Sequence, residues 1–481
     1  RFHGTDLESE GRWRDGSLVR WRDGSLRPVG GWVDRLGSAP YNAAPRGMLG
    51  WEANDGTRWI AAGTYNKLYA TTGGGTTYDI TPGTLTAGTE DATVNTGYGG
   101  GFYGQGFYGQ PVQATGQYSE ATTWSLDNWG QYLVACNPAD GKLWEWQLGT
   151  GSDAAVIANA PTDCLGLVVT EDRFIFALGA DGDPRRIAWC DFEDNTLWAA
   201  ASTNQAGDID LQTSGQIMAG IRTAGQMLIL TDQEAHRSTY VGPPFIHQFE
   251  RVSSACGLIA RKAVVDTPAG VFWMSSAGFF TYDGSAVREI QCDVHDKVFS
   301  DLNQAQISKC WAVSNGPNGE VWFYYPSANS LEIDRYVVFD YKEGHWSMGA
   351  LARTSGFDRG VFKTPVWGDP DGSIYNHETG FNYDGGEVYA ESGPFKIGTG
   401  ENLAVVTSLI PDELNLGDVT TTFKTRLYPT STETSHGPYT MTQPTSVRLQ
   451  GRQVRMKVTG NTPSAWRVGR FRFEAKPGGK R

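Results

Sequence analysis

The chain has 481 residues, of which 61 are Gly, 22 Pro and 17 Trp, and its formal net charge is −13. Aromatic residues make up 12% and charged residues only 19%, which excludes intrinsic disorder because disordered chains carry few aromatics and much charge. So much Gly and Trp also excludes collagen, coiled-coil and helical-bundle folds. No run approaches 18 apolar residues, so we expect no transmembrane helix and predict a large all-β protein.

The N-terminal segment, residues 1–44, contains two identical heptapeptides, RWRDGSL, which begin at Arg12 and at Arg20. Each copy has the pattern of a strand that enters an Asp-Gly-Ser turn, so together they predict a β-hairpin. Trp and Arg are favoured at the centres of protein interfaces, so we expect a docking segment. Its candidate assembly contacts are Arg12, Trp13, Arg14, Arg20, Trp21 and Arg22. The alternative is a strand pair that closes the domain that follows.

From residue 45 to 385, pairs of short β-branched or aromatic strands recur between Gly- and Asp-rich turns. The pairs are centred near residues 60, 137, 172, 230, 275, 330 and 372, and after the first gap they recur every 35–58 residues. A repeat of roughly 40–50 residues with about four short strands is the signature of a β-propeller. We therefore predict six or seven blades, the alternative being two or three stacked β-sandwiches.

An insertion at about residues 84–119 interrupts this rhythm after the first strand pair. It contains a doubled GFYGQ at 101–105 and 106–110, and so Gly-rich a stretch cannot build a core of its own. Long insertions of this kind are usually functional or flexible. We expect either a gate or a subunit contact, with Tyr98, Phe102, Tyr103, Phe107 and Tyr108 as its candidate residues, or else a plain surface loop.

The last segment, residues 386–481, alternates apolar and polar residues in three stretches, 420–427, 446–458 and 466–474. This pattern predicts a separate C-terminal β-sandwich. Its expected buried residues are Leu449, Val454, Met456, Val458, Val468, Phe471 and Phe473.

Charge is divided unequally along the chain. From Ser446 onward there are ten basic residues and one acid, or +9, whereas residues 1–445 carry 30 basic and 52 acidic groups, or −22. The acidic part should repel a polyanion such as duplex DNA. The basic end could meet phosphates or an acidic protein partner, or be a solvated strand face. Its candidate contact residues are Arg448, Arg452, Arg455, Arg467, Arg470 and Arg472.

The sequence holds no strong signature of an enzyme or a metal site. The six cysteines are widely spaced and are expected to be buried reduced thiols, and the seven histidines form no metal-binding pair. Asp208 and Asp210 could act as paired carboxylates, and Glu145 stands between two Trp, but turn-edge acids and an edge strand explain them as well. We therefore expect no catalysis, metal or cofactor. A glycan-binding or glycan-cleaving propeller is the alternative function.

Several motifs together resemble one virion family. They are RWRDGSLRPVGGW near the N-terminus, the GFYGQ tandem, WMSSAGFFTYDG at 273–284 and the terminal SAWRVGRFRFEAKPGGKR. The chain is similar in these to the tail nozzle proteins of short-tailed bacteriophages, also called tail tubular protein B or packaged-DNA stabilisation proteins.

The resemblance implies a non-enzymatic structural protein with a β-propeller and appended β domains. It further implies a ring of six copies below the portal and the adaptor, or head–tail connector, with tail fibres or spikes as further partners. Such a protein is assembled in the host cytoplasm and located in the virion tail. Packaged DNA would be retained by the ring and would pass through its lumen without sequence-specific binding, which the acidic body would favour by repulsion.

Overall fold

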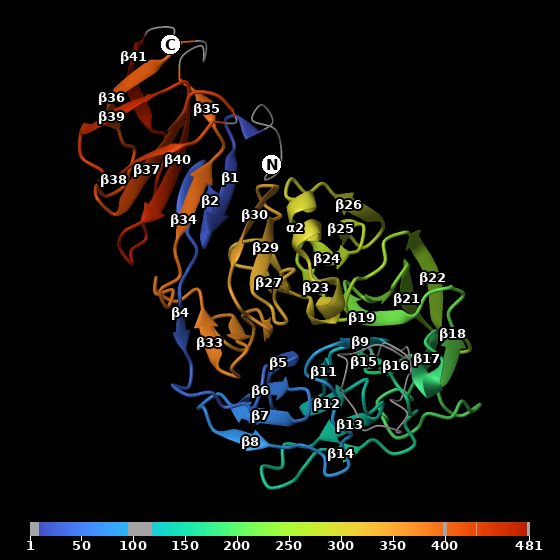
Figure 1. Cartoon of the computed structure of the whole chain (residues 1–481). Helices are drawn as coiled ribbons and strands as arrows, with labels where there is room; N and C mark the ends of the chain where they lie inside the picture. The colour runs from blue at the N-terminus through green and yellow to red at the C-terminus, as the bar shows by residue number, and fades with distance from the viewer. Residues whose placement is uncertain (1–8, 95–117, 398–401, 430, 479–481) are drawn as a thin grey trace, which may run out of the picture.

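The structure is a computed structural model that describes residues 9–94, 118–397, 402–429 and 431–478. Seven four-stranded antiparallel sheets follow one another around an axis, and a smaller two-sheet unit lies beside them (Figure 1). In the described residues, no helix is both long and apolar enough to span a membrane.

Six of the sheets are simple meanders, each made by four consecutive strands. Sheet one consists of β5 (Gly47–Glu52), β6 (Arg58–Gly63), β7 (Leu68–Thr72) and β8 (Thr77–Asp79). Sheet two consists of β11 (Ser125–Trp129), β12 (Tyr132–Cys136), β13 (Leu143–Trp146) and β14 (Ala155–Val156). Sheet three consists of β15 (Gly166–Val169), β16 (Ile175–Leu178), β17 (Arg186–Trp189) and β18 (Gly207–Asp210). Sheet four consists of β19 (Ile217–Thr223), β20 (Gln226–Thr231), β21 (Glu234–Gly242) and β22 (Ile246–Ser254). Sheet five consists of β23 (Val264–Thr267), β24 (Gly270–Ser275), β25 (Gly278–Tyr282) and β26 (Val287–Ile290). Sheet six consists of β27 (Trp311–Asn315), β28 (Glu320–Tyr325), β29 (Arg335–Asp340) and β30 (His345–Ala350).

The seventh sheet joins the two ends of the ring. It consists of β31 (Ser355–Phe357), β32 (Val366–Gly368), β33 (Ile374–His377) and, as its outer strand, β4 (Trp32–Asp34) from the N-terminal segment. The first strand of every sheet contacts the first strand of the next, and β31 contacts β5. The chain therefore forms a closed seven-bladed β-propeller, which confirms the predicted propeller and excludes stacked sandwiches.

Aromatic side chains fill the spaces between blades, which accounts for the high Trp content. The ring centroids of Trp59 and Trp146 lie 5.0 Å apart between blades one and two, and those of Trp322 and Trp367 lie 5.4 Å apart between blades six and seven. Large rings pack well here because each blade meets a neighbour on both faces. For the same reason the middle strand β28 is buried along its whole length.

The smaller unit is a β-sandwich of two sheets. One sheet has the order β1 (Trp13–Ser17), β34 (Tyr389–Ser392), β40 (Gln453–Gly460), β37 (Val419–Arg426) and β38 (Thr434–Thr440), with β35 (Phe395–Lys396) also paired to β40. The other has the order β39 (Thr445–Gly451), β36 (Ala404–Ile410) and β41 (Arg472–Pro477). Of the predicted core residues, Leu449, Val454, Val458 and Val468 are fully buried, and Met456, Phe471 and Phe473 are partly buried.

The two copies of RWRDGSL adopt different structures, which corrects the prediction that each enters a turn. In the second copy, β2 (Val19–Arg22) turns through Asp23 and Gly24, at φ 52° and 71°, into β3 (Ser25–Pro28). Two successive positive φ values define the tight hairpin turn that Asp-Gly favours. In the first copy the same Asp-Gly-Ser lies inside strand β1, which pairs with β34. Tertiary pairing therefore overrides the local turn signal in the first copy.

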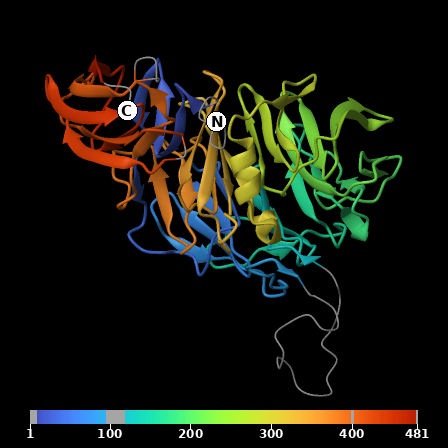
Figure 2. The ribbon, with the colours of Figure 1, turned by 45° about the horizontal axis from the view of Figure 1, so that its top comes forward.

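The described residues include three short helical segments. They are η1 (Ala180–Gly182) in blade three, and α2 (His295–Asp301) and η2 (Gln304–Lys309) between blades five and six. The view from a second direction shows the C-terminal sandwich and both N-terminal strands β1 and β2 on the same side of the propeller (Figure 2).

Candidate functional site

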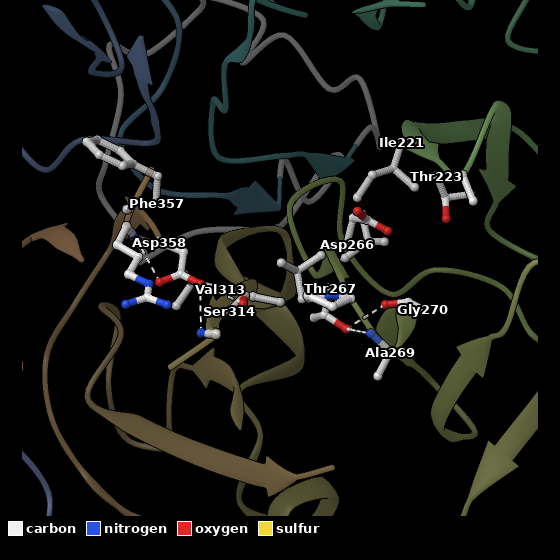
Figure 3. A pocket seen from close by; sticks show the side chains of 18 of the residues that line it. Ile221, Thr223, Asp266, Thr267, Ala269, Gly270, Val313, Ser314, Phe357 and Asp358 are labelled. Atoms are coloured by element: carbon white, nitrogen blue, oxygen red, sulfur yellow. Dashed lines mark hydrogen bonds between the residues drawn. The ribbon is translucent and has the colours of Figure 1, made fainter. Parts of the chain in front are cut away.

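A large cavity lies at one end of the propeller axis, where the first strands of the blades end. We call it the wide chamber: it measures about 980 Å³ and is lined by residues of blades one, four, five, six and seven. Figure 3 shows the groups that face it, among them Thr223 from β19, Asp266 from β23 and Asp358 after β31. A volume near 1,000 Å³ is at the upper end of the range for ligand sites.

The polar groups of the wide chamber are mainly acidic. The Asp358 carboxylate accepts hydrogen bonds from Ser314 Oγ at 2.8 Å and from the backbone N–H of Gly316 at 2.7 Å. Asp266 stands at the other side of the cavity, and burial raises the pKa of its carboxyl group. Thr223, Thr267, Asp283 and Arg359 also line the cavity. Such a set of groups suits a hydroxyl-rich or cationic molecule.

A second cavity, the narrow chamber, lies at the opposite end of the same strands. It measures about 160 Å³ and shares Met48, Val264 and Ala312 with the wide chamber. Its charged lining residues are all cations, namely Arg46, Lys262 and Lys309. The axis of the propeller therefore runs from an acidic end to a basic end. No motif in the sequence marked these residues, because they come from three separate linkers between blades.

The base of the 84–119 insertion is attached at this basic end. Its first and last described strands, β9 (Thr93–Val94) and β10 (Tyr118–Ser119), pair with each other. The backbone of Ala92 exchanges two hydrogen bonds of 2.9 Å with the side chain of Gln306 in η2. The N–H of Ala121 donates to Ser308 Oγ at 3.0 Å. The expected gate residues Tyr98, Phe102, Tyr103, Phe107 and Tyr108 lie outside the described residues.

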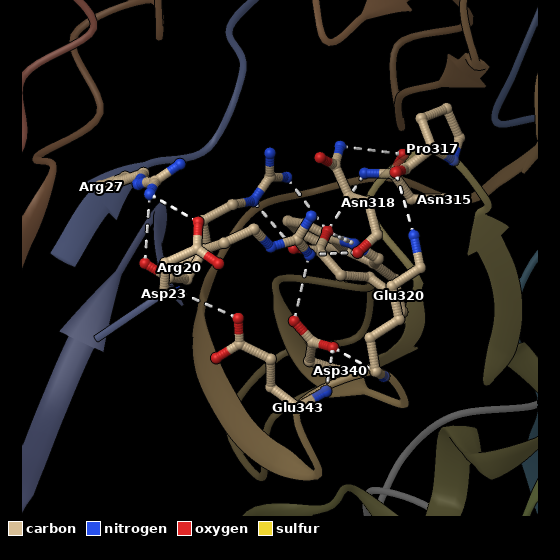
Figure 4. Close-up of polar contacts among 12 residues, drawn as sticks. Arg20, Asp23, Arg27, Asn315, Pro317, Asn318, Glu320, Asp340 and Glu343 are labelled. Atoms are coloured by element: carbon tan, nitrogen blue, oxygen red, sulfur yellow. Dashed lines mark hydrogen bonds and ion pairs between the residues drawn. The ribbon is translucent and has the colours of Figure 1, made fainter. Parts of the chain in front are cut away.

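The N-terminal hairpin is joined to the propeller by buried ion pairs (Figure 4). The Arg20 guanidinium lies 2.8 Å from a Glu320 oxygen and 2.6 Å from a Glu378 oxygen. Burial, with Glu378 close by, raises the pKa of Glu320. Arg22 binds Asp340 at 3.2 Å and also donates to the Asn318 carbonyl. The guanidinium groups of Arg20 and Arg22 thus bind carboxylates of the same chain. These two arginines join the hairpin to the propeller in place of the docking role we expected.

The remaining candidates of the hairpin are more accessible. The rings of Trp13 and Trp21 pack together at 5.8 Å, and both are partly buried against the core that the sandwich shares with blades six and seven. The Arg12 side chain is 55% exposed and lies 3.9 Å from Asp293. Arg14 is partly exposed.

The six arginines of the expected basic face do not lie on one sheet. Arg448 and Arg472 lie in β39 and β41 of one sheet, and Arg455 lies in β40 of the other. The remaining three lie between strands. Arg455 in β40 binds Glu391 at 2.5 Å and Glu433 at 3.1 Å, and Arg452 stacks 5.0 Å over Tyr428. The other four are exposed and form no ion pair with any described residue; they are Arg448, Arg467, Arg470 and Arg472. The prediction of a single six-arginine face is therefore wrong, since Arg455 pairs internally on the other sheet.

Exposed apolar side chains lie among these free arginines. Ile410 pairs with Arg472 across β36 and β41, and the N–H of Leu414 donates to the Arg467 carbonyl. Ile410, Leu414 and Leu416 are 39%, 62% and 45% exposed. We call Ile410, Leu414, Leu416, Arg467, Arg470 and Arg472 the basic-apolar patch. Arg beside apolar residues is the composition of protein interfaces, in which Arg is enriched and other charges are depleted.

An oppositely charged patch lies at the outer edge of blades three and four. Asp208 and Asp210 are exposed on β18 and share Arg186, whose nearest carboxylate atom is 3.0 Å away on Asp210. Phe245, at the tip of the β21–β22 hairpin, is 79% exposed. We call Asp208, Asp210, Phe192, Leu197, Val241 and Phe245 the acidic-apolar edge. In Figure 1, β18 and β22 lie on the side of the molecule opposite to the sandwich.

Metal and thiol chemistry have no evident centre in the described ranges. No group of three or more His, Cys, Asp or Glu residues there could hold a metal ion. All six cysteines are free; five are buried, as predicted, and Cys292 is partly exposed. Burial raises the pKa of the Cys164, Cys190 and Cys310 thiols to about 12, so these thiols are unreactive at neutral pH.

No family model and no curated protein sequence matches the chain. Among solved structures it is similar to virginiamycin B lyase from Staphylococcus aureus, with 10% identity and a TM-score of 0.44 over 72% of this chain and 97% of that chain. It is also similar to the Pan2 WD40 domain of Neurospora crassa, with 9% identity and a TM-score of 0.40 over 74% of this chain and 95% of that domain. PorZ, a surface component of the type-IX secretion system of Porphyromonas gingivalis, matches 78% of this chain with 44% of its own, at 8% identity and a TM-score of 0.40.

At such low identity these similarities concern the fold alone. From its own sheets, the chain is a seven-bladed β-propeller protein with an appended β-sandwich.

Proposed function

We propose that this chain is a structural assembly protein that packs side by side with copies of itself into a closed ring, and that the ring is the tail nozzle of a bacteriophage. The observation that carries the proposal is the basic-apolar patch. It offers arginines free of described ion pairs, together with exposed Ile and Leu, on a chain whose net charge is −13.

The acidic-apolar edge gives this patch a complementary surface on the next copy. Two different patches on opposite sides of one subunit make a head-to-tail contact, and repeated contacts of this type close into a ring at a suitable rotation. Opposite charges would align the subunits, while Phe245 and Leu414 would contribute apolar burial.

The nozzle identity rests on the sequence motifs that resemble that family. The propeller with an appended β-sandwich agrees with the architecture that the resemblance implies. The acidity of residues 1–445, at −22, would also keep DNA from adhering to the wall of a conduit. The adaptor, fibre and spike partners, and the candidate loop at Tyr98–Tyr108, belong to the same proposal.

Charge reversal on the patch tests ring formation. We expect the wild-type chain to form closed rings in negative-stain images and in native mass spectrometry. The triple variant Arg467→Glu/Arg470→Glu/Arg472→Glu should remain monomeric, because it places like charges against Asp208 and Asp210. Phe245→Ser should weaken assembly of the oligomer, because it removes an exposed phenyl group from the other side of the contact.

Lys363→Glu is the matched control, since Lys363 is an exposed cation in the loop between β31 and β32 and belongs to neither patch. It should form rings like the wild type. A wild-type chain that stays monomeric at high concentration would overturn the proposal, and so would triple-variant rings of wild-type size and abundance.

A carbohydrate-binding propeller is the second candidate, and the wide chamber is the observation that favours it. Asp266, Asp358 and Thr223 provide hydrogen-bonding groups for sugar hydroxyls, and Phe357 provides an apolar ring. A glycan array with the wild-type chain and an Asp266→Ala/Asp358→Ala variant tests it. Binding that the double variant loses, on a monomeric chain, would support this candidate against the assembly protein.

A further inference from the structure

The narrow chamber holds one positive charge more than its neighbouring carboxylates neutralise. Arg46 binds Glu332 at 2.5 Å, and Lys309 binds the same carboxylate at 3.2 Å and Asp91 at 2.6 Å. Arg46 and Lys309 lower the pKa of Glu332 even though burial opposes its ionisation. The charges of Arg46 and Lys309 are therefore neutralised by those of Glu332 and Asp91. Lys262, the third cation of the chamber, adds the surplus positive charge.

Lys262 forms no ion pair or hydrogen bond through its ammonium group with any described residue, although it lines the chamber. Asp127 is the carboxylate whose charge acts on this ammonium group. That carboxylate is already engaged, because it accepts from Arg222 and from the Val169 N–H, both at 2.9 Å. Residues 95–117 of the insertion contain no Asp or Glu, so that segment cannot supply a counterion either.

The chamber also has the size and the neutral groups that a small anion needs. Its volume of about 160 Å³ equals roughly five liquid-water volumes, which is below the range of about 300–1,000 Å³ for drug-sized ligands. Thr123 and Ser355 line it, and their hydroxyl groups have no hydrogen-bond partner in the described part of the chain. An ammonium group among hydroxyls, in a space for one compact group, is suited to a tetrahedral oxyanion.

We infer that the narrow chamber is a binding site for a single small oxyanion, of the class of inorganic phosphate or sulfate, with Lys262 as its main charged ligand. Bound there, the anion would neutralise the surplus charge beside η2 and the base of the insertion. This inference does not depend on ring formation.

The surroundings of Lys262 also affect the pKa of its ammonium group. Burial lowers the pKa of its ammonium group to about 8, and Asp127 only partly offsets this effect. An anion in the chamber would favour the protonated form and raise this pKa again.

Titration with inorganic phosphate and with sulfate, each at constant ionic strength set by chloride, tests the inference on the full chain. We expect saturable heat by calorimetry and a rise in melting temperature for the wild type. Lys262→Met should bind at least about tenfold more weakly, because a hydrogen bond to a charged group is lost. Lys262→Arg should retain much of the binding, and the exposed-site control Lys363→Met should bind like the wild type.

A second readout does not depend on affinity. The ¹³C signal of reductively methylated Lys262, assigned by its absence from Lys262→Met, should titrate at higher pH when phosphate is present. The inference is overturned if phosphate and sulfate give no saturable response in the wild type. It is equally overturned if Lys262→Met responds as the wild type does, or if the Lys262 titration is unmoved by either anion.

Discussion

At the scale of single residues, the surroundings of His247 oppose the charged form of its imidazole. It is 8% exposed and packs edge-on against Phe174, Phe176 and Trp189 at ring distances of 4.9, 4.8 and 5.3 Å. Its Nε2 has no hydrogen-bond partner among the described residues. Burial lowers the pKa of its imidazole to about 4, so the folded chain holds this ring neutral.

This environment predicts a loss of stability in acid. The unfolded chain takes up a proton at His247 near pH 6.5, whereas the folded chain does so only near pH 4. The free energy of unfolding should therefore fall progressively from pH 6.5 to 4, by up to about 3 kcal/mol from this residue. His247→Phe keeps an aromatic ring and removes the titration. Urea unfolding at pH 7 and pH 4 should show a smaller difference for the variant, and identical differences would refute the assignment.

At the scale of elements, the junction between the β2–β3 hairpin and the propeller depends on Arg20. One guanidinium, 12% exposed, stands between Glu320 and Glu378. Removing a single partner from a buried ionic group leaves uncompensated charge, which costs about 3–5 kcal/mol. We expect Arg20→Met to lower the free energy of unfolding by that amount, and Arg20→Met/Glu320→Gln to recover part of it.

Arg58 supplies the control for this experiment. It pairs with Glu52 at 3.1 Å, but both side chains are more than 40% exposed, and exposed pairs contribute at most about 1 kcal/mol. Arg58→Met should therefore change the urea midpoint very little. If the two Arg→Met variants lose equal stability, the buried cluster does not hold the hairpin.

The middle strands of the blades could be predicted from sequence because they are buried on both faces. Runs such as QYLVA at 131–135 and EVWFYY at 320–325 became β12 and β28. The first and last strands carry weaker patterns. β8 (Thr77–Asp79) is short and polar, and β26 (Val287–Ile290) has two charged residues in its middle and no buried residue. Their strand structure depends on pairing with a strong neighbour, which local sequence does not encode.

The candidate sites show the same limit. The exposed arginines of the sandwich could be predicted from the alternation in 466–474, but Arg455 could not be separated from them without knowing that Glu391 and Glu433 lie beside it. Lys262 looks like any polar residue in ARKAVV, since the chamber is built from linkers of blades far apart in sequence. The charge of the narrow chamber therefore depends on the closure of the propeller, which brings these linkers together, and not on a local sequence motif.

At the scale of the whole molecule, the propeller is held closed by three residues of β4. Trp32, Val33 and Asp34 pair with His377, Asn376 and Tyr375, and they join the start of the chain to the last blade. The strand β1, earlier in the same N-terminal segment, pairs with β34 of the sandwich. One short N-terminal segment thus ties together both units, so opening of β4 should be the first step in the loss of the ring.

A cross-link between β4 and β33 should therefore stabilise the chain more than one within a blade. Val33→Cys/Asn376→Cys joins paired positions that enclose the whole propeller, whereas Glu52→Cys/Arg58→Cys joins paired positions of one hairpin. A disulfide that closes a long loop removes more entropy from the unfolded chain, about 4 kcal/mol or more against roughly 2 for a short loop. Oxidised and reduced forms of both variants should be compared by thermal unfolding, with the six native thiols intact. If the hairpin cross-link raises the melting temperature as much as the β4–β33 cross-link, ring closure does not limit the stability of this fold.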